Sequence, residues 1–189
     1  MTADLAAVPG YVAGTWVIDP VHSDVGFVVR HVLVSKVRGH FTKFEGQIVT
    51  AADPLASTVT ATIDLASIDT SNQQRDDHIR SADFFEVEKY PTMTYHSSGI
   101  RHDGADYVLD GELTLKGTTL PVPLKLEVNG FAPDPFAAGG TRAGFTATGE
   151  INRMDFGVSF NGPMPGGGVI LAEKVQIVLE IEAALQTGA

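Results

Sequence analysis

The feature that most constrains this chain is a two-residue alternation of apolar and polar side chains that recurs along most of its length. The stretch "STVTATIDL" places Val59, Ala61 and Ile63 on one side, with threonines between them. The pattern returns in "SDVGFVVRH", "YVLDGELTL", "LPVPLKLEV", "FTATGEI" and "KVQIVLEIEA". Successive side chains of a β-strand point to opposite faces, so this period predicts strands with one apolar face. With shorter strands at "TWVID", "GHFTKFEGQIV" and "TMTYHSSGI", we expect eight or nine strands and one helix.

All-β chains with clean alternation fold as sandwiches or barrels. An eight-stranded barrel has an interior just wide enough to be filled by side chains or to hold one small ligand. The inward faces mix large residues with small ones, namely Ala61, Gly111, Ala147, Gly149 and Ala183. Small inward residues fit an open lumen, and they fit a packed, tapering core equally well. The pattern alone leaves both interpretations open.

Two places predict irregular strands. Phe41 precedes Phe44 by three residues, so the inward phase changes and a bulge is expected near Thr42–Lys43. Pro121 and Pro123 cannot donate to a ladder, so their stretch is expected near a sheet edge or in an irregular segment.

The Pro/Gly-rich stretches "FAPDPFAAGGTRAG" and "NGPMPGGG" are short enough to be loops within one domain. The expected division is an N-terminal tail at residues 1–14 and one barrel domain at residues 15–189. The net charge of -10 argues against nucleic acids and anionic membrane surfaces as main partners. The absence of cysteine excludes disulfides, cysteine-based zinc sites and thiol nucleophiles. The N-terminus does not read as a signal peptide, and no apolar run approaches the roughly 20 residues of a membrane span. We therefore expect a cytoplasmic protein without membrane insertion.

The stretch "SNQQRDDHIRSADFF" concentrates ionisable groups and predicts a helix. Ser71 fits an N-cap, with Gln74 three residues later completing a capping box. Asp76 and Arg80 stand four residues apart and are expected to pair on the exposed side.

The opposite face of this helix is expected to be buried, and it carries charge. Arg75, His78, Ile79 and Ala82 fall at positions i, i+3, i+4 and i+7. Buried polar groups need partners. Arg75 and His78 would therefore either hold a structural hydrogen-bond network or meet a polar group of a ligand.

Metal and hydrolytic sites are poorly supported by the same residues. Asp76 and His78 are two apart on a helix and point in different directions. Neighbouring strand residues such as His22, Ser23 and Asp24 alternate in direction and cannot form a triad, and there is no G-x-S-x-G elbow. We predict neither a metal ligand set nor a catalytic set.

Two further polar residues are candidates for a pocket. His31 ends an inward apolar stripe, where it could be a core histidine bonded to backbone or a pocket group near Arg75 or His78. Arg153 lies where a strand turns, where it could pair with Asp155 or contact a ligand.

Five stretches together resemble the YceI-like polyisoprenoid-binding family, in that family's order and across most of residues 15–183. They are "WVIDPVHSDVGFVVRH", "VRGHFTKFEGQI", "IDTSNQQRDDHIRSADFFEVEKYPTMTYHSS", "LDGELTLKGTTLPVPL" and "GEINRMDFGV". In the third and most specific stretch the matching residues are Arg75, Asp76, His78, Phe84, Phe85, Tyr90 and Pro91. The resemblance implies an extended, lipocalin-like, eight-stranded antiparallel barrel with one helix packed near its mouth. It also implies a long apolar tunnel for an isoprenoid chain, such as a quinone tail or a polyprenyl phosphate, and a possible homodimer.

The expected function is therefore binding of a polyisoprenoid or similar long lipid, for transport, storage or stress protection. No cofactor or metal is expected beyond the bound lipid. The expected tunnel lining is Trp16, Ile18, Phe27, Val29, Phe41, Ile63, Phe84, Leu113 and Phe145. The groups expected at the polar head or mouth are His31, Arg75, His78 and Arg153. Two alternatives remain: an enzyme acting through the Arg75/His78 helix face, and a general scavenger of hydrophobic compounds.

Overall fold

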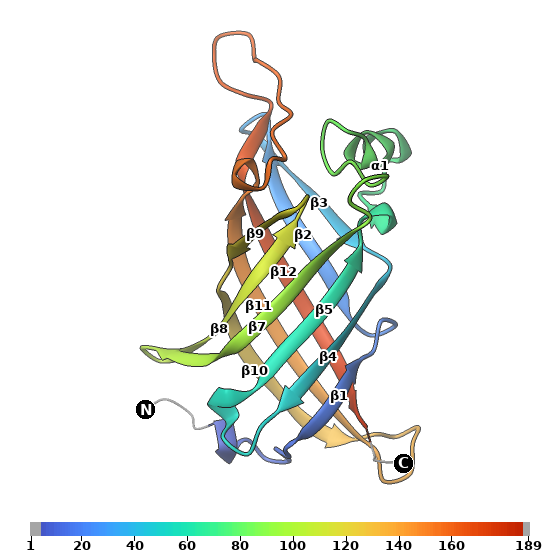
Figure 1. Ribbon diagram of the computed structural model, residues 1–189, viewed down its shortest axis with the longest axis vertical. Coiled ribbons are helices and arrows are strands. Elements are labelled where there is room, and N and C mark those ends of the chain that lie inside the picture. The colour runs from blue at the N-terminus through green and yellow to red at the C-terminus, as the bar shows by residue number, and fades with distance from the viewer. Residues whose placement is uncertain (1–4, 187–189) are drawn as a thin grey trace.

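The computed structural model describes residues 5–186, and within them the chain forms twelve strands, one α-helix and four short 3-10 helices (Figure 1). The strands are β1 (Gly14–Ile18), β2 (Asp24–His31), β3 (Ser35–Phe41), β4 (Phe44–Thr50), β5 (Thr58–Asp64), β6 (Ile68–Asp69), β7 (Thr92–Asp103), β8 (Asp106–Leu115), β9 (Thr118–Pro121), β10 (Leu124–Pro133), β11 (Thr141–Asn152) and β12 (Leu171–Leu185). The helices are η1 (Leu5–Ala7), η2 (Pro54–Ala56), η3 (Leu65–Ser67), α1 (Gln73–Arg80) and η4 (Arg153–Phe156).

The twelve strands occupy eight positions in a closed antiparallel ring. The long strand β12 pairs with β1 near its C-terminal end and with β2 along the rest, so β1 and β2 are two halves of one barrel strand. In the same way β4 and β3 pair with β5 and β6 respectively, and β10 and β9 both pair with β8. Counted in this way, the ring follows chain order, and β12 returns to β1. The predicted eight-stranded antiparallel barrel with one helix is confirmed.

Irregularities lie at both predicted places, although the first is a break between two strands and not a bulge. Thr42–Lys43 separates β3 from β4, and η3 lies opposite this break, where Ser67 receives hydrogen bonds from the Thr42 and Lys43 amides (3.1 and 3.0 Å). The segment of η3 is itself a second break, between β5 and β6, and a third break at residues 19–23 separates β1 from β2. One wall is thus split into a half with β1, β4 and β5 and a half with β2, β3 and β6. The proline stretch is also irregular, since β9 ends at Pro121 and β10 begins only at Leu124.

The helix α1 forms where it was predicted, but its cap and ion pair were predicted wrongly. Asn72 is the N-cap, and its side-chain oxygen accepts from the Arg75 amide at 2.9 Å. Ser71 precedes the cap in a left-handed conformation, with φ of 61°. The Asp76 carboxylate is buried and accepts from the amide and hydroxyl of Thr70. It therefore anchors the helix to the chain that leaves β6, while Arg80 pairs with Asp77 at 3.0 Å.

Only some of the small inward residues lie beside empty space. A Cβ added to Gly111 would lie 2.5 Å from the Tyr95 hydroxyl oxygen, and one on Gly149 would lie 2.6 Å from Leu124 Cδ2. These glycines make room for neighbouring side chains, whereas Ala61 and Ala147 line an internal cavity. Among the described residues, no helix has the length and apolar character needed to cross a membrane.

Candidate functional site

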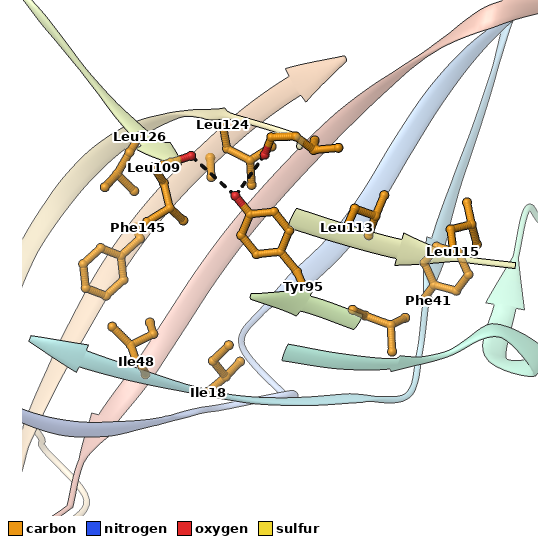
Figure 2. Close-up of a cluster of buried hydrophobic side chains, with 14 of the residues drawn as sticks. Ile18, Phe41, Ile48, Tyr95, Leu109, Leu113, Leu115, Leu124, Leu126 and Phe145 are labelled. Atoms are coloured by element: carbon orange, nitrogen blue, oxygen red, sulfur yellow. Dashed lines mark hydrogen bonds between the residues drawn. The ribbon is translucent and has the colours of Figure 1, made fainter. Parts of the chain in front are cut away.

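The barrel encloses an apolar cavity of about 470 Å³, within the roughly 300–1,000 Å³ typical of small-molecule sites. Figure 2 shows part of its wall, where apolar side chains from several strands converge on Tyr95. The Tyr95 hydroxyl donates to the carbonyl oxygens of Val122 (3.0 Å) and Leu109 (3.4 Å). Burial raises the pKa of this phenol, which keeps it neutral. The one hydroxyl in this part of the wall is therefore satisfied and uncharged.

The exposure of the inward side chains shows that the interior is hollow. Val25, Phe27, Val59, Ile177 and Leu179 all line the cavity, yet each is only partly buried. An inward strand residue in a filled barrel would be fully buried, because protein cores pack without large voids. These side chains keep surface that faces the cavity, and an apolar ligand could cover it.

An aromatic cluster forms the floor of the cavity, at the β1 end of the barrel. The rings of Trp16 and Tyr11 each lie 5.5 Å from the ring of Phe131. Trp16 Nε1 donates to Thr50 Oγ1 at 2.8 Å, and the Tyr11 hydroxyl donates to the Ala51 carbonyl at 2.7 Å. The polar atoms of these rings are thus used within the protein. The predicted tail, as far as it lies within the described residues 5–14, packs here, and its first four residues lie outside them.

The opposite end of the cavity is formed by α1, the turn after it and the loop before β12. His78, Phe84 and Phe160 make a three-ring contact with centroid distances of 5.1, 4.8 and 5.2 Å. His78 Nε2 is 2.7 Å from an Asp83 carboxylate oxygen. Phe160 is 42% exposed, so this cluster is open to solvent where the floor is not. We call this end the mouth.

Arg75 lies at the mouth with part of its guanidinium uncommitted. Its Nε and Nη2 atoms donate to the hydroxyl and carbonyl of Thr70 at 2.7 and 2.8 Å. Arg75 and His78 line both the apolar cavity and a small adjoining polar pocket, which Asn72 and Gln74 complete. The expectation that Arg75 and His78 would be buried on the inner helix face is wrong, since both are exposed. Asp76 is the residue that α1 buries, because it is the group that binds the chain after β6.

The match to known proteins covers this arrangement except for the segment that carries Tyr11. The profile of the YceI-like domain matches residues 16–183, which run from β1 into β12 and include α1. The chain belongs to the YceI-like family. Protein YceI of Escherichia coli is a relative with 36% identity over 167 residues, covering 87% of this chain and 83% of that protein.

Two solved structures share the barrel. Burkholderia cenocepacia BcnA superposes with a TM-score of 0.71 and 27% identity, covering 87% of this chain and 98% of that one. A polyisoprenoid binding domain from Saccharophagus degradans, implicated in plant cell wall breakdown, superposes with a TM-score of 0.68 over 93% of this chain and all (100%) of that one. Its sequence identity is 17%, so this second likeness concerns the fold.

Arg153, a residue within the YceI-like match, is buried to 4% exposure without a carboxylate partner among the described residues. It donates to four backbone carbonyls, those of Ala172, Val158, Phe160 and Leu171, at 2.9, 2.6, 2.9 and 3.3 Å. Burial lowers the pKa of the guanidinium, while nearby Glu173 raises it. Arg153 therefore fastens the loop after η4 to β12, and the pair with Asp155, one of the two alternatives for this residue, does not form.

His31 shows the opposite behaviour. Its half-buried side chain lines the cavity. Within residues 5–186, no hydrogen bond or ion pair reaches its imidazole, so the structure offers no support for a core histidine bonded to backbone. His31 is available to a ligand at the mouth side of β2.

Nearly all the residues predicted for the site of this YceI-like protein line one cavity. They are Ile18, Phe27, Val29, Phe41, Ile63, Phe84, Leu113 and Phe145 among the apolar ones, and His31, Arg75, His78 and Arg153 among the polar ones. Trp16 differs, since it is fully buried within the floor cluster. Sequence reasoning missed Tyr11, Phe131 and Phe160. Tyr11 and Phe160 lie outside the strands, and Phe131 follows a bulge in β10, so alternation gave no signal for them.

A second polar cluster lies away from the cavity, at the break between β1 and β2. Asp19, His22 and Glu182 bring ligand-type atoms within 4.8 Å of one another. The Arg142 guanidinium already bonds Asp19 and Glu182, the latter at 2.7 Å, and it also binds Asp134 at 3.0 Å. Arg142, with help from His22, holds the pKa of Asp19 well below its usual range. The cluster is an ion-pair network that ties β1, β11 and β12 together.

Proposed function

We propose that this YceI-like protein binds a polyisoprenoid or similarly long apolar lipid, with the chain in the barrel and the polar end at Arg75 and His78. The observation that carries the proposal is the asymmetry of the cavity. Its walls are apolar and its floor has satisfied polar atoms, whereas the mouth presents Arg75, His78 and the unpartnered imidazole of His31. An amphipathic ligand with a long apolar chain matches that distribution.

The likeness to the polyisoprenoid binding domain of Saccharophagus degradans supports this ligand class, because the two share the barrel that would hold the chain. The energetics are sufficient as well. An isoprenoid of about forty carbons at about 0.3 kcal/mol per atom would gain roughly 12 kcal/mol, which is a nanomolar dissociation constant. Since an apolar slot cannot count methylenes sharply, we expect loose chain-length specificity. Affinities that fall steeply with the loss of one isoprene unit would contradict it.

The test begins with native mass spectrometry of protein purified without detergent, followed by identification of any retained molecule. Protein stripped of ligand is then titrated with an octaprenyl phosphate and with a quinone carrying the same tail. The substitution Ala61→Phe should fill part of the cavity and reduce uptake at least about tenfold. Thr60→Phe, on the outward face of the same strand, is the matched control and should bind normally. Empty protein that takes up neither compound would overturn the proposal.

One contact favours a second function, an enzyme acting on a bound molecule. The His78 imidazole and the Asp83 carboxylate are 2.7 Å apart at the edge of the cavity, which is the pairing that orients a general base. His78→Ala separates the two functions. It should abolish turnover in an enzyme and only weaken lipid affinity in a binding protein. We propose the binding protein, because the apolar walls account for far more of the site than this single pair.

A further inference from the structure

Large apolar side chains are exposed beside the mouth of the cavity. Val34 is 84% exposed and Leu33 is 65% exposed at the tip of the β2–β3 hairpin, and Val169 and Ile170 are 43% and 39% exposed in the loop before β12. The Val32 amide donates to the Ile170 carbonyl at 2.7 Å, which joins the two segments. We call Val32, Leu33, Val34, Val169 and Ile170 the rim patch. Ile170 and His31 also line the cavity, so the patch borders its mouth. Figure 1 shows the hairpin and the loop at the same end of the barrel as α1.

The backbone at the tip is strained in order to hold these side chains. Val32 and Leu33 have φ of 51° and 61°, and the Val34 amide closes the turn on the His31 carbonyl at 3.2 Å. Positive φ at both central residues is the type I′ pattern, which Asn-Gly fills at least cost. A β-branched residue there is strained. A polar turn such as Asn-Gly would make the hairpin more stable. The apolar tip therefore indicates a role other than stabilising the fold.

Positive charge surrounds the tip, although the chain as a whole carries -10. Arg30, Lys36 and Arg38 are all exposed on β2 and β3, and Arg30 lies directly across from Lys36. No carboxylate of the described chain comes within ion-pair distance of any of the three. Two like charges facing each other on a sheet destabilise it. Arg30 Nη1 donates to the Leu33 carbonyl at 3.3 Å and so helps to hold the turn, but within the described residues no such contact accounts for the charge of Lys36 or Arg38.

Exposed apolar side chains flanked by cations without carboxylate partners are the features of a surface that enters the headgroup region of an anionic bilayer. We propose that the rim patch, with Arg30, Lys36 and Arg38, docks the mouth onto anionic phospholipid membranes. The overall negative charge does not prevent this, because attraction acts within about a Debye length of the surface, and Arg30, Lys36 and Arg38 lie beside the tip that would touch it. Lipid exchange as the purpose of docking rests on the proposed function, whereas docking itself does not.

The first test is flotation with phosphatidylcholine vesicles, with and without phosphatidylglycerol and free of isoprenoid. The double substitution Val32→Asn/Leu33→Gly installs the preferred turn, so the melting temperature should stay equal or rise. Partition onto phosphatidylglycerol vesicles should fall roughly tenfold or more. Phe136→Ser is the control, since Phe136 is 85% exposed but lies in the loop between β10 and β11. It should partition like the unmodified protein.

The second test removes the charge with Arg30→Gln/Lys36→Gln/Arg38→Gln. This variant should lose the preference for phosphatidylglycerol, by roughly a hundredfold for three cations. Unchanged partition of either variant would overturn the proposal. A second outcome would also overturn it: the protein does not bind vesicles, and it sediments as a dimer that the tip substitution dissociates. The rim patch would then be an interface between two copies of this chain. If the protein binds vesicles but takes up no isoprenoid in solution, the result would contradict the proposed function and would still support docking.

Discussion

At the floor of the barrel the polar atoms of Trp16 and Tyr11 are bonded within the protein, whereas at the mouth His31 and part of Arg75 have no partner. The floor rings pack edge-on or tilted against Phe131, and Trp16 is fully buried. The mouth rings of His78, Phe84 and Phe160 contact each other but remain open to solvent. One end of the barrel is thus sealed by packed, hydrogen-bonded rings, and the other end leaves polar groups free for a ligand. A ligand should therefore enter and leave past α1.

The largest loss of stability should come from a substitution in the floor. Trp16→Ala is expected to lower the free energy of unfolding by about 3–5 kcal/mol, because it leaves a cavity beneath Phe131 and removes the bond to Thr50. Chemical denaturation measures it. Val17→Ala, on the outward side of the same strand, is the control and should cost about 1 kcal/mol or less. Equal losses for the two would show that the floor is not a tightly packed cluster.

Detaching the helix should have the next largest effect. Asp76→Ala leaves the buried amide and hydroxyl of Thr70 without their acceptor, at an expected cost of about 2–3 kcal/mol. Asp77→Ala, on the exposed side, should cost much less. Hydrogen exchange should show α1 and the turn after it opening while β1 stays protected. Loss of protection at the floor as well would mean that the two ends are not independent.

The ion pairs at the β1–β2 break predict a pH dependence. Because the pKa of Asp19 is lowered in the folded protein, its contribution to stability is fully present above its ordinary value near 3.8 and is lost as pH falls toward the folded pKa. Melting temperatures measured from neutral pH down to about pH 2 should therefore fall more steeply below about pH 4 in the unmodified protein than in Asp19→Asn. Parallel curves for the two proteins would contradict this assignment.

The smallest effect on stability should come from the mouth. Phe160→Ala removes a ring that is 42% exposed, so it should cost less than about 1 kcal/mol. Release of a bound isoprenoid should nevertheless accelerate, by roughly fivefold, because the ring contacts with His78 and Phe84 are lost. Stopped-flow displacement measures the rate. A slower release would place the exit elsewhere.

Alternation was enough to predict most strands and which of their side chains face inward, because period two assigns each side chain to a face, whereas the hollow barrel was predicted from the family resemblance. It could not predict partners set by distant residues. Ser71 and Asn72 are both good caps, and the choice depends on the backbone conformation of Ser71 and on the hydrogen bonds that Thr70 donates to Asp76. Arg153 was expected to contact a ligand or to pair with Asp155, yet its acceptors are backbone carbonyls that include two on β12, 18 and 19 residues along the chain.

The split wall has a mechanical consequence. The half with β2, β3 and β6 carries α1 through the Asp76 anchor, and it joins the lower half of the same wall through the breaks at residues 19–23, 42–43 and 65–67. The short segments of these breaks can serve as hinges, while β12 runs unbroken past both halves. We expect the half with β2, β3 and β6 to move as a unit and to widen the entrance, which would admit a bulky end group of the ligand. The half with β1, β4 and β5 should keep its shape around the far end of the ligand's apolar chain.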